Sequence, residues 1–86
     1  MDISVELTLT PLQDEFEAPI IQFIQRLRAS GLVVKENPLS TQVYGEYTAV
    51  MQCLNEEIER SFNELEHVVL QMKMVKSDRS DYMADF

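Results

Sequence analysis

Hydrogen-bonding side chains gather in one short stretch of the sequence, residues 37–42 (Asn-Pro-Leu-Ser-Thr-Gln). Amide and hydroxyl groups of this kind hold a neutral heterocycle by directed hydrogen bonds. Because Asn37-Pro38 favours a tight turn, we expect Ser40, Thr41 and Gln42 at the start of the strand that follows it. The stretch is a candidate small-molecule site, and the alternative is an ordinary exposed strand with common polar residues.

The other side chains that could do chemistry are isolated from one another. The single histidine, His67, has no second His or Cys with which to share a metal. Cys53 is expected on a helix, where a free cysteine is usually a small core residue rather than a nucleophile. The glutamates between residues 56 and 66 are expected on the solvated face of that helix, partly paired with Arg60. No glycine-rich loop is present to hold a phosphate. We therefore predict no catalytic residue, no metal site and no cofactor.

The balance of acidic and basic residues limits the classes of molecule that the protein is expected to bind. The 86 residues include fifteen acidic and seven basic side chains, which give a formal net charge of -8 at pH 7. Such a chain repels phosphate backbones and anionic membranes, so we expect no nucleic acid and no membrane as partner. A neutral or cationic small molecule fits better. One cysteine, and an amino end without a basic and apolar leader, indicate a cytoplasmic protein.

A single α+β domain is expected to position the polar stretch. The predicted elements, in order, are a strand over residues 3–9, a helix over 16–30, strands over 32–37 and 39–44, a helix over 48–65 and a strand over 68–74. An Asp14–Glu17 capping box and a Gly31 C-cap bound the first helix, and Thr48 is the expected N-cap of the second. The order βαββαβ predicts a ferredoxin-like fold, in which two helices cover one face of a four-stranded antiparallel sheet.

Alternation along the strands predicts the two faces of that sheet. The face toward the helices is expected to carry Ile3, Val5, Leu7, Leu9, Thr41, Val43, Val68, Leu70, Met72 and Met74. The other face is expected to carry Ser4, Glu6, Thr8, Ser40, Gln42, Tyr44, Val69, Gln71 and Lys73. Its mixture of apolar and charged residues favours a partly hydrated contact between two sheets over a fully solvated surface. We therefore predict a homodimer that can pair again into a homotetramer.

Three segments resemble the YkoF-like thiamine/hydroxymethylpyrimidine-binding family. They are residues 7–16 (LTLTPLQDEF), 40–47 (STQVYGEY) and 67–72 (HVVLQM), in the order and at the spacing of that family. The resemblance covers residues 3–76. We expect these to form the ligand-binding domain, residues 1–76, followed by a tail, residues 77–86, that can pack on a neighbouring subunit. The thiamine-binding members carry two such domains in one chain, and a homodimer of this chain would rebuild the pair.

The resemblance implies a non-catalytic protein that binds thiamine or its hydroxymethylpyrimidine moiety. The expected ligand-binding residues are Thr8, Asp14, Asn37, Ser40, Thr41 and Gln42. The cationic thiazolium ring would lie near Asp14 or Glu6. Two other readings stay open: a ligand-free structural or regulatory oligomerisation module, and a small cofactor-free dimeric enzyme that uses His67.

Overall fold

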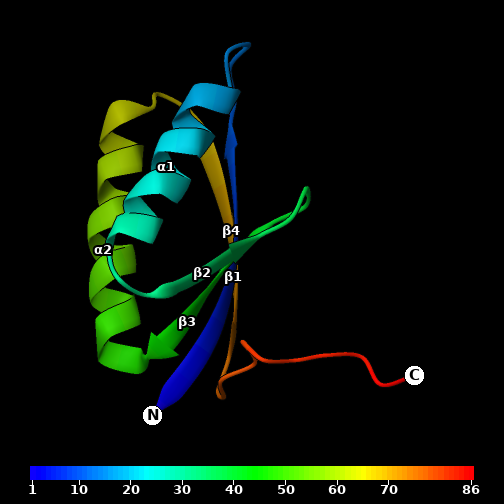
Figure 1. Cartoon of the computed structure of the whole chain (residues 1–86). Helices are drawn as coiled ribbons and strands as arrows, with labels where there is room; N and C mark the ends of the chain where they lie inside the picture. Colours follow the sequence, from blue (N-terminus) through cyan, green and yellow to red (C-terminus); the bar gives the residue numbers. More distant parts are fainter.

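The computed structural model describes residues 1–86 and has the predicted element order. The elements are β1 (Asp2–Pro11), α1 (Glu17–Ala29), β2 (Val33–Glu36), β3 (Thr41–Glu46), α2 (Tyr47–Glu64) and β4 (Val68–Val75). The strands form one antiparallel sheet in the order β2-β3-β1-β4, and both helices cover the same face of it (Figure 1). This is the ferredoxin-like fold. Neither helix is long and apolar enough to cross a membrane.

Strand pairing confirms the two predicted faces of the sheet. Leu7 of β1 lies directly opposite Thr41 of β3 and Met72 of β4. Residues that lie opposite one another in a sheet point to the same face, so these three side chains point toward the helices. The side chains that point the other way form the open face, over which no helix lies. The open face carries Asp2, Ser4, Glu6, Thr8, Thr10, Val33, Lys35, Gln42, Tyr44, Glu46, Val69, Gln71, Lys73 and Val75.

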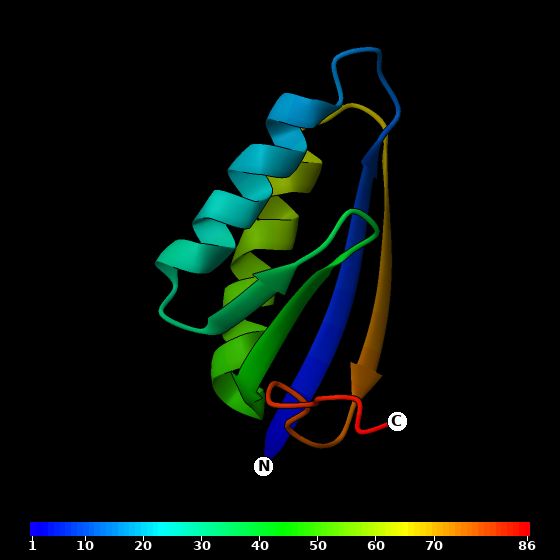
Figure 2. The same cartoon turned by 45° about the vertical axis from the view of Figure 1, so that its right-hand side comes forward.

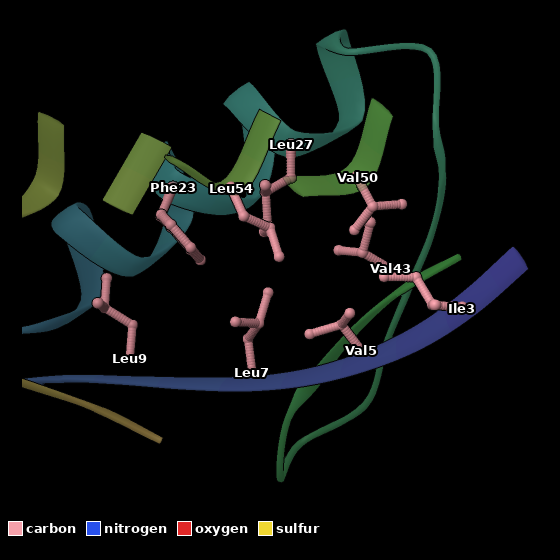
Figure 3. Packing of buried hydrophobic residues seen from close by; sticks show 9 residues of the cluster. All are labelled: Ile3, Val5, Leu7, Leu9, Phe23, Leu27, Val43, Val50 and Leu54. Atoms are coloured by element: carbon pink, nitrogen blue, oxygen red, sulfur yellow. The ribbon is translucent and has the colours of Figure 1, made fainter. Parts of the chain in front are cut away.

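The hydrophobic core lies between the helices and the two central strands, β1 and β3 (Figure 3). Its nine buried apolar side chains are Ile3, Val5, Leu7, Leu9, Phe23, Leu27, Val43, Val50 and Leu54. Met72 and Met74 of β4 point to the same side, but 47% and 40% of these residues remain exposed. They lie on the predicted face without joining the core, because β4 is an edge strand and the helices leave its outer side open.

The ends of the helices follow the sequence prediction only in part. Gly31 ends α1 as predicted and adopts a φ of +87°, a conformation that glycine reaches without a steric penalty. The Asp14–Glu17 capping box is not formed, since α1 has Phe16 at its N-cap and no side chain bonded there. In α2 the cap is Glu46 rather than Thr48. The carboxylate of Glu46 accepts the Ala49 N–H at 3.1 Å, where the positive end of the helix favours an acidic group.

The connection between β2 and β3 is longer than the tight turn that Asn37-Pro38 predicted. It comprises residues 37–40, and the Asn37 N–H donates to the Ser40 carbonyl at 3.1 Å. The side-chain oxygen of Asn37 accepts the N–H groups of Leu39 and Ser40, at 2.8 and 3.0 Å. These bonds compete with strand pairing, so β3 begins at Thr41 and not at Leu39.

A half-buried ion pair joins the two helices. Arg26 Nε of α1 lies 2.6 Å from Glu57 Oε2 of α2, and Arg26 Nη2 donates to the buried hydroxyl of Ser61 at 3.2 Å. The expected partner of the glutamates, Arg60, makes no ion pair. Arg26 takes that place because it reaches α2 from the neighbouring helix, which the sequence spacing within α2 could not reveal.

Candidate functional site

A polar network lies on the open face where the β2–β3 connection meets β1. The Ser40 hydroxyl donates to Glu6 Oε2 at 3.0 Å, and Gln42 Nε2 donates to Ser40 Oγ at 2.7 Å. The pairing of β1 with β3 explains the contact, since Glu6 and Gln42 are directly opposite one another. We call Glu6, Ser40 and Gln42 the polar network. All three are partly exposed, so a ligand on the open face can reach them.

Thr8 lies beside the polar network on the same face. It is the next open-face residue of β1 after Glu6, and its hydroxyl is 3.5 Å from the Leu39 carbonyl oxygen. This long contact leaves the hydroxyl available to a ligand. The structure therefore brings together three of the six predicted ligand-binding residues, Thr8, Ser40 and Gln42.

The other three predicted residues lie elsewhere. Asn37 uses its side-chain oxygen to hold the β2–β3 connection, so it shapes the loop that carries Ser40. Thr41 is buried and points to the helix side of the sheet, away from the polar network. Asp14 lies in the exposed loop between β1 and α1, which extends beyond the tip of the β2–β3 hairpin (Figure 2). Of the two acidic residues proposed for a cationic ring, only Glu6 belongs to the network.

Sequence reasoning missed a second feature of the open face, in which the chain after β4 folds back across it. The buried Ser4 hydroxyl donates to the Ser77 carbonyl at 2.7 Å and accepts the Arg79 N–H at 2.9 Å. Lys35 Nζ donates to the Ser80 carbonyl. We call residues 77–80 the strap. No periodicity marks this segment, and Ser4 is one of several polar residues on its face of β1, so nothing in the sequence signalled this contact. Beyond the strap, the chain extends away on the side opposite the helices (Figure 1).

The strap borders a small pocket of about 160 Å³ on the open face. The pocket is lined by Ser4, Val5, Glu6, Gln42, Tyr44, Lys73, Val75 and Arg79. It shares Glu6 and Gln42 with the polar network, so the two form one continuous site. Lys73 Nζ lies 3.7 Å from Glu6 Oε1, and Lys35 Nζ lies 5.7 Å from the centre of the Tyr44 ring.

Larger hollows lie away from the open face and fit a binding site less well. One of about 400 Å³ lies along α2 and is lined by polar side chains alone, and one of about 220 Å³ lies in the β1–α1 loop at Asp14. Two more lie beside the helices. A hollow of about 480 Å³ between α1 and α2 is lined in part by Arg26 and Glu57, whose charges are already paired with one another. A groove of about 360 Å³ between α2 and β4 is lined mainly by apolar side chains such as Phe62 and Met72. Neither contains a predicted ligand-binding residue. The open face combines hydroxyl, amide and charged groups within one site, as recognition of a polar ring requires.

Two titratable groups have shifted pKa values, and both lie outside the polar network. Hydrogen bonds from the Ser80 side chain and backbone N–H lower the pKa of the Asp78 carboxyl, and Lys35 adds to the effect. Burial raises the pKa of the Cys53 thiol, against a hydrogen bond with Ser30 that lowers it. A raised pKa disfavours the thiolate, which is the nucleophilic form of cysteine.

The residues considered for catalysis do not converge. The His67 side chain is largely exposed at the start of β4, next to Glu66 at 3.8 Å. The backbone carbonyl of His67 accepts the Leu12 N–H at 2.9 Å, so the position has a structural role in joining β4 to the end of β1. Cys53 lies on α2, on the other side of the sheet from the polar network.

Comparison with solved structures shows the same fold in several proteins. A Thermotoga maritima protein described as a candidate for thiamine biosynthesis or salvage is 19% identical, with 90% of this chain and 85% of that chain covered and a TM-score of 0.81. A Streptococcus pneumoniae protein is 26% identical over 91% of this chain and 89% of that one, with a TM-score of 0.83. A Bacillus cereus domain of unknown function is 12% identical over 99% and 85%, with a TM-score of 0.75. We find no matching curated protein.

The sequence also matches a family model directly. The model is described as thiamine-binding protein, and the match covers residues 5–85. It therefore includes the polar network, the strap and every residue that lines the pocket except Ser4. This chain belongs to the thiamine-binding protein family.

Proposed function

We propose that this protein binds thiamine or its hydroxymethylpyrimidine moiety at the polar network and does not convert it. The observation that carries the proposal is the hydrogen-bonded set Glu6, Ser40 and Gln42 on an uncovered sheet face, in a chain of the thiamine-binding protein family. The relative from Thermotoga maritima, with its description in thiamine biosynthesis or salvage, supports the same ligand class.

The chemistry of the network suits the two rings of thiamine. An aminopyrimidine offers both donors and acceptors, and Gln42 and Ser40 can supply both in return. The thiazolium ring carries a positive charge that the carboxylate of Glu6 can offset, since Glu6 points onto the same face. Thr8 adds a hydroxyl at the edge of the network. Two predicted residues then act indirectly. Thr41 is buried on the helix side of β3, and Asn37 holds the loop that presents Ser40.

A non-catalytic role is supported by what lies around the network. Its side chains are a carboxylate, a hydroxyl and an amide, and no histidine or cysteine approaches them. General acid–base catalysis uses a group within hydrogen-bond reach of the reacting atoms. Glu6 is the one titratable residue of the network, and its oxygens face Ser40 and Lys73.

We further propose that two chains pair through their open faces. Val69 lies on this face with 46% of the residue exposed, and Tyr44, below Lys35, is only partly buried. A second pairing of such dimers would give the tetramer.

Isothermal titration calorimetry with thiamine and with hydroxymethylpyrimidine tests the ligand. Replacing Gln42 by Ala is expected to weaken binding about tenfold, the loss of roughly one hydrogen bond to a ligand. Gln25→Ala on the exposed side of α1 is the matched control and is expected to leave the affinity unchanged. Absence of heat with both compounds would refute the proposal. Sedimentation of the protein at tens of micromolar tests the assembly, and a monomer would refute pairing.

A further inference from the structure

The pocket of about 160 Å³ beside the polar network is lined by basic side chains of the open face and the strap. Lys73 and Arg79 line it, and Lys35 borders it through its contacts with Tyr44 and the strap. Glu6 is the one acidic side chain in the lining. The chain as a whole is strongly acidic, so this concentration of positive charge in one hollow is a local feature and not a consequence of composition.

The cationic side chains of this pocket have hydrogen-bond donors that no other group of the chain uses. The backbone N–H of Arg79 is bound to Ser4, and its Nε donates to Ser77 Oγ at 2.7 Å. The two Nη groups of Arg79 make no hydrogen bond within the chain and remain free to act as donors. Lys73 has one charged neighbour, Glu6, at the long distance of 3.7 Å. An anion in the pocket would therefore find two cations that the protein does not neutralise fully.

We propose that this pocket binds the phosphate group of a phosphorylated ligand, so that the protein prefers the phosphate ester of thiamine to the free alcohol. The proposal rests on the proposed function, since it places the rings of the ligand at the polar network. A phosphate monoester carries between one and two negative charges near pH 7 and offers three acceptor oxygens. Arginine binds such a group with paired hydrogen bonds, and lysine binds it as a point charge. In this pocket, cationic side chains would bind the phosphate group, which in other proteins is bound by the backbone N–H groups of a glycine-rich loop.

The spacing along the sheet fits a ligand with opposite charges at its centre and at one end. Thr8, Glu6 and Ser4 follow one another on the open face of β1, and alternate residues of a strand are about 6.6 Å apart. Glu6 in the middle would face the cationic thiazolium ring. Thr8 and Ser40 lie on one side of Glu6, and Arg79, bound to Ser4, lies on the other, which is the order of pyrimidine, thiazolium and phosphate in the ester.

Ser4 is a positioning residue in this arrangement. Its hydroxyl holds the strap at both Ser77 and Arg79, and it is 7% exposed. Without that hydroxyl the strap would lose its anchor on β1, and Arg79 would no longer be held over the pocket.

Calorimetry with thiamine and thiamine monophosphate, on the full chain at low ionic strength, tests the inference. The wild-type protein is expected to bind the ester about tenfold more tightly than the alcohol, as two charge-assisted contacts at a partly exposed site would give. In the double variant Lys73→Gln, Arg79→Gln the ratio of the two affinities should fall to about one. Lys76→Gln removes one positive charge from the same end, half of what the double variant removes, and Lys76 does not line the pocket, so this variant should keep most of the preference.

Each result has a distinct meaning. Equal affinity for the two compounds in the wild-type protein would overturn this inference and leave the proposed function standing. Absence of binding by either compound would overturn both. A loss of preference in Lys76→Gln as large as in the double variant would show that the effect comes from overall charge, and would also overturn a specific pocket. Circular dichroism of the variants checks that they are folded, which the exposure of Lys73 and Arg79 leads us to expect.

Discussion

The two strands β1 and β4 lie side by side, have the same alternating pattern and differ in how they are covered. Leu7 and Met72 are directly paired and point to the same face, yet Leu7 is 1% exposed and Met72 is 47% exposed. The helices lie over β1, and their side chains close around it (Figure 3). Beside β4 they leave the apolar groove that Met72 and Phe62 line. An alternating pattern thus determines which way a side chain points, and the neighbouring layer determines whether it is buried.

The largest effect expected from this difference is on the free energy of unfolding when one side chain of each strand is replaced by alanine. Leu7→Ala should lower the free energy of unfolding by about 3 kcal/mol, because it removes buried methyl groups and leaves a cavity. Met72→Ala should cost less than about 1 kcal/mol, since half of the side chain is already in water. Urea denaturation of the two variants measures both values. Equal costs would mean that the groove beside β4 is covered in solution, and the comparison would fail.

Two of the ion pairs extend the comparison to charged groups. The Arg26 and Glu57 side chains are 19% and 13% exposed, whereas those of Arg28 and Glu36 are 52% and 40% exposed. Glu57→Gln should destabilise the fold by about 2 kcal/mol, because it leaves a half-buried guanidinium with Glu64, 3.9 Å away and half exposed, as its one carboxylate neighbour. Glu36→Gln should cost no more than about 0.5 kcal/mol. Thermal unfolding of both variants gives the difference, and a larger loss for Glu36→Gln would contradict this account.

On the open face, Ser4 is buried because the strap covers it. Ser4→Ala should cost about 1 kcal/mol, since it removes one hydrogen bond that the hydroxyl donates and one that it accepts under the strap. It should also release the strap, so that trypsin cleaves after Arg79 faster than in the wild-type chain. Thr10 lies exposed on the same face, and Thr10→Ala provides the control. Unchanged cleavage in Ser4→Ala would show that other contacts hold the strap.

The smallest effect is expected from Asp78, which is fully exposed. Its pKa in the folded protein is lower than the ordinary value of 3.8, chiefly because of the hydrogen bonds from Ser80. A lowered pKa stabilises the fold above pH 3.8, and this contribution is lost as the pH falls through the lower, folded value. Ser80→Ala should raise the pKa of Asp78 toward 3.8, as measured by NMR titration of the carboxyl carbon. If the pKa of Asp78 does not change in this variant, it is lowered by the backbone N–H of residue 80 or by Lys35 instead.

Local sequence patterns predicted most of the fold, and three of the six residues predicted to bind a ligand lie together on the open face. Strict alternation marks β1 and β4 because a strand with one face toward a core repeats every two residues. Gly31 marks the end of α1 because few other residues adopt its φ. The Thr48 cap was wrong since Glu46, still extended at the end of β3, reaches the first free N–H groups of α2 with its carboxylate. Thr8, Ser40 and Gln42 were found together because they share one face of adjoining strands.

The sequence by itself determined the order of the elements, the direction in which each strand residue points and the acidic charge of the chain. These properties depend on neighbouring residues and on composition. Only the tertiary structure decided that Met72 remains exposed, that Arg26 rather than Arg60 pairs with Glu57, and that Glu6 closes the polar network. It also brought the strap onto Ser4, more than seventy residues away in the chain. Contacts of this range depend on how the layers pack, and no local pattern encodes them.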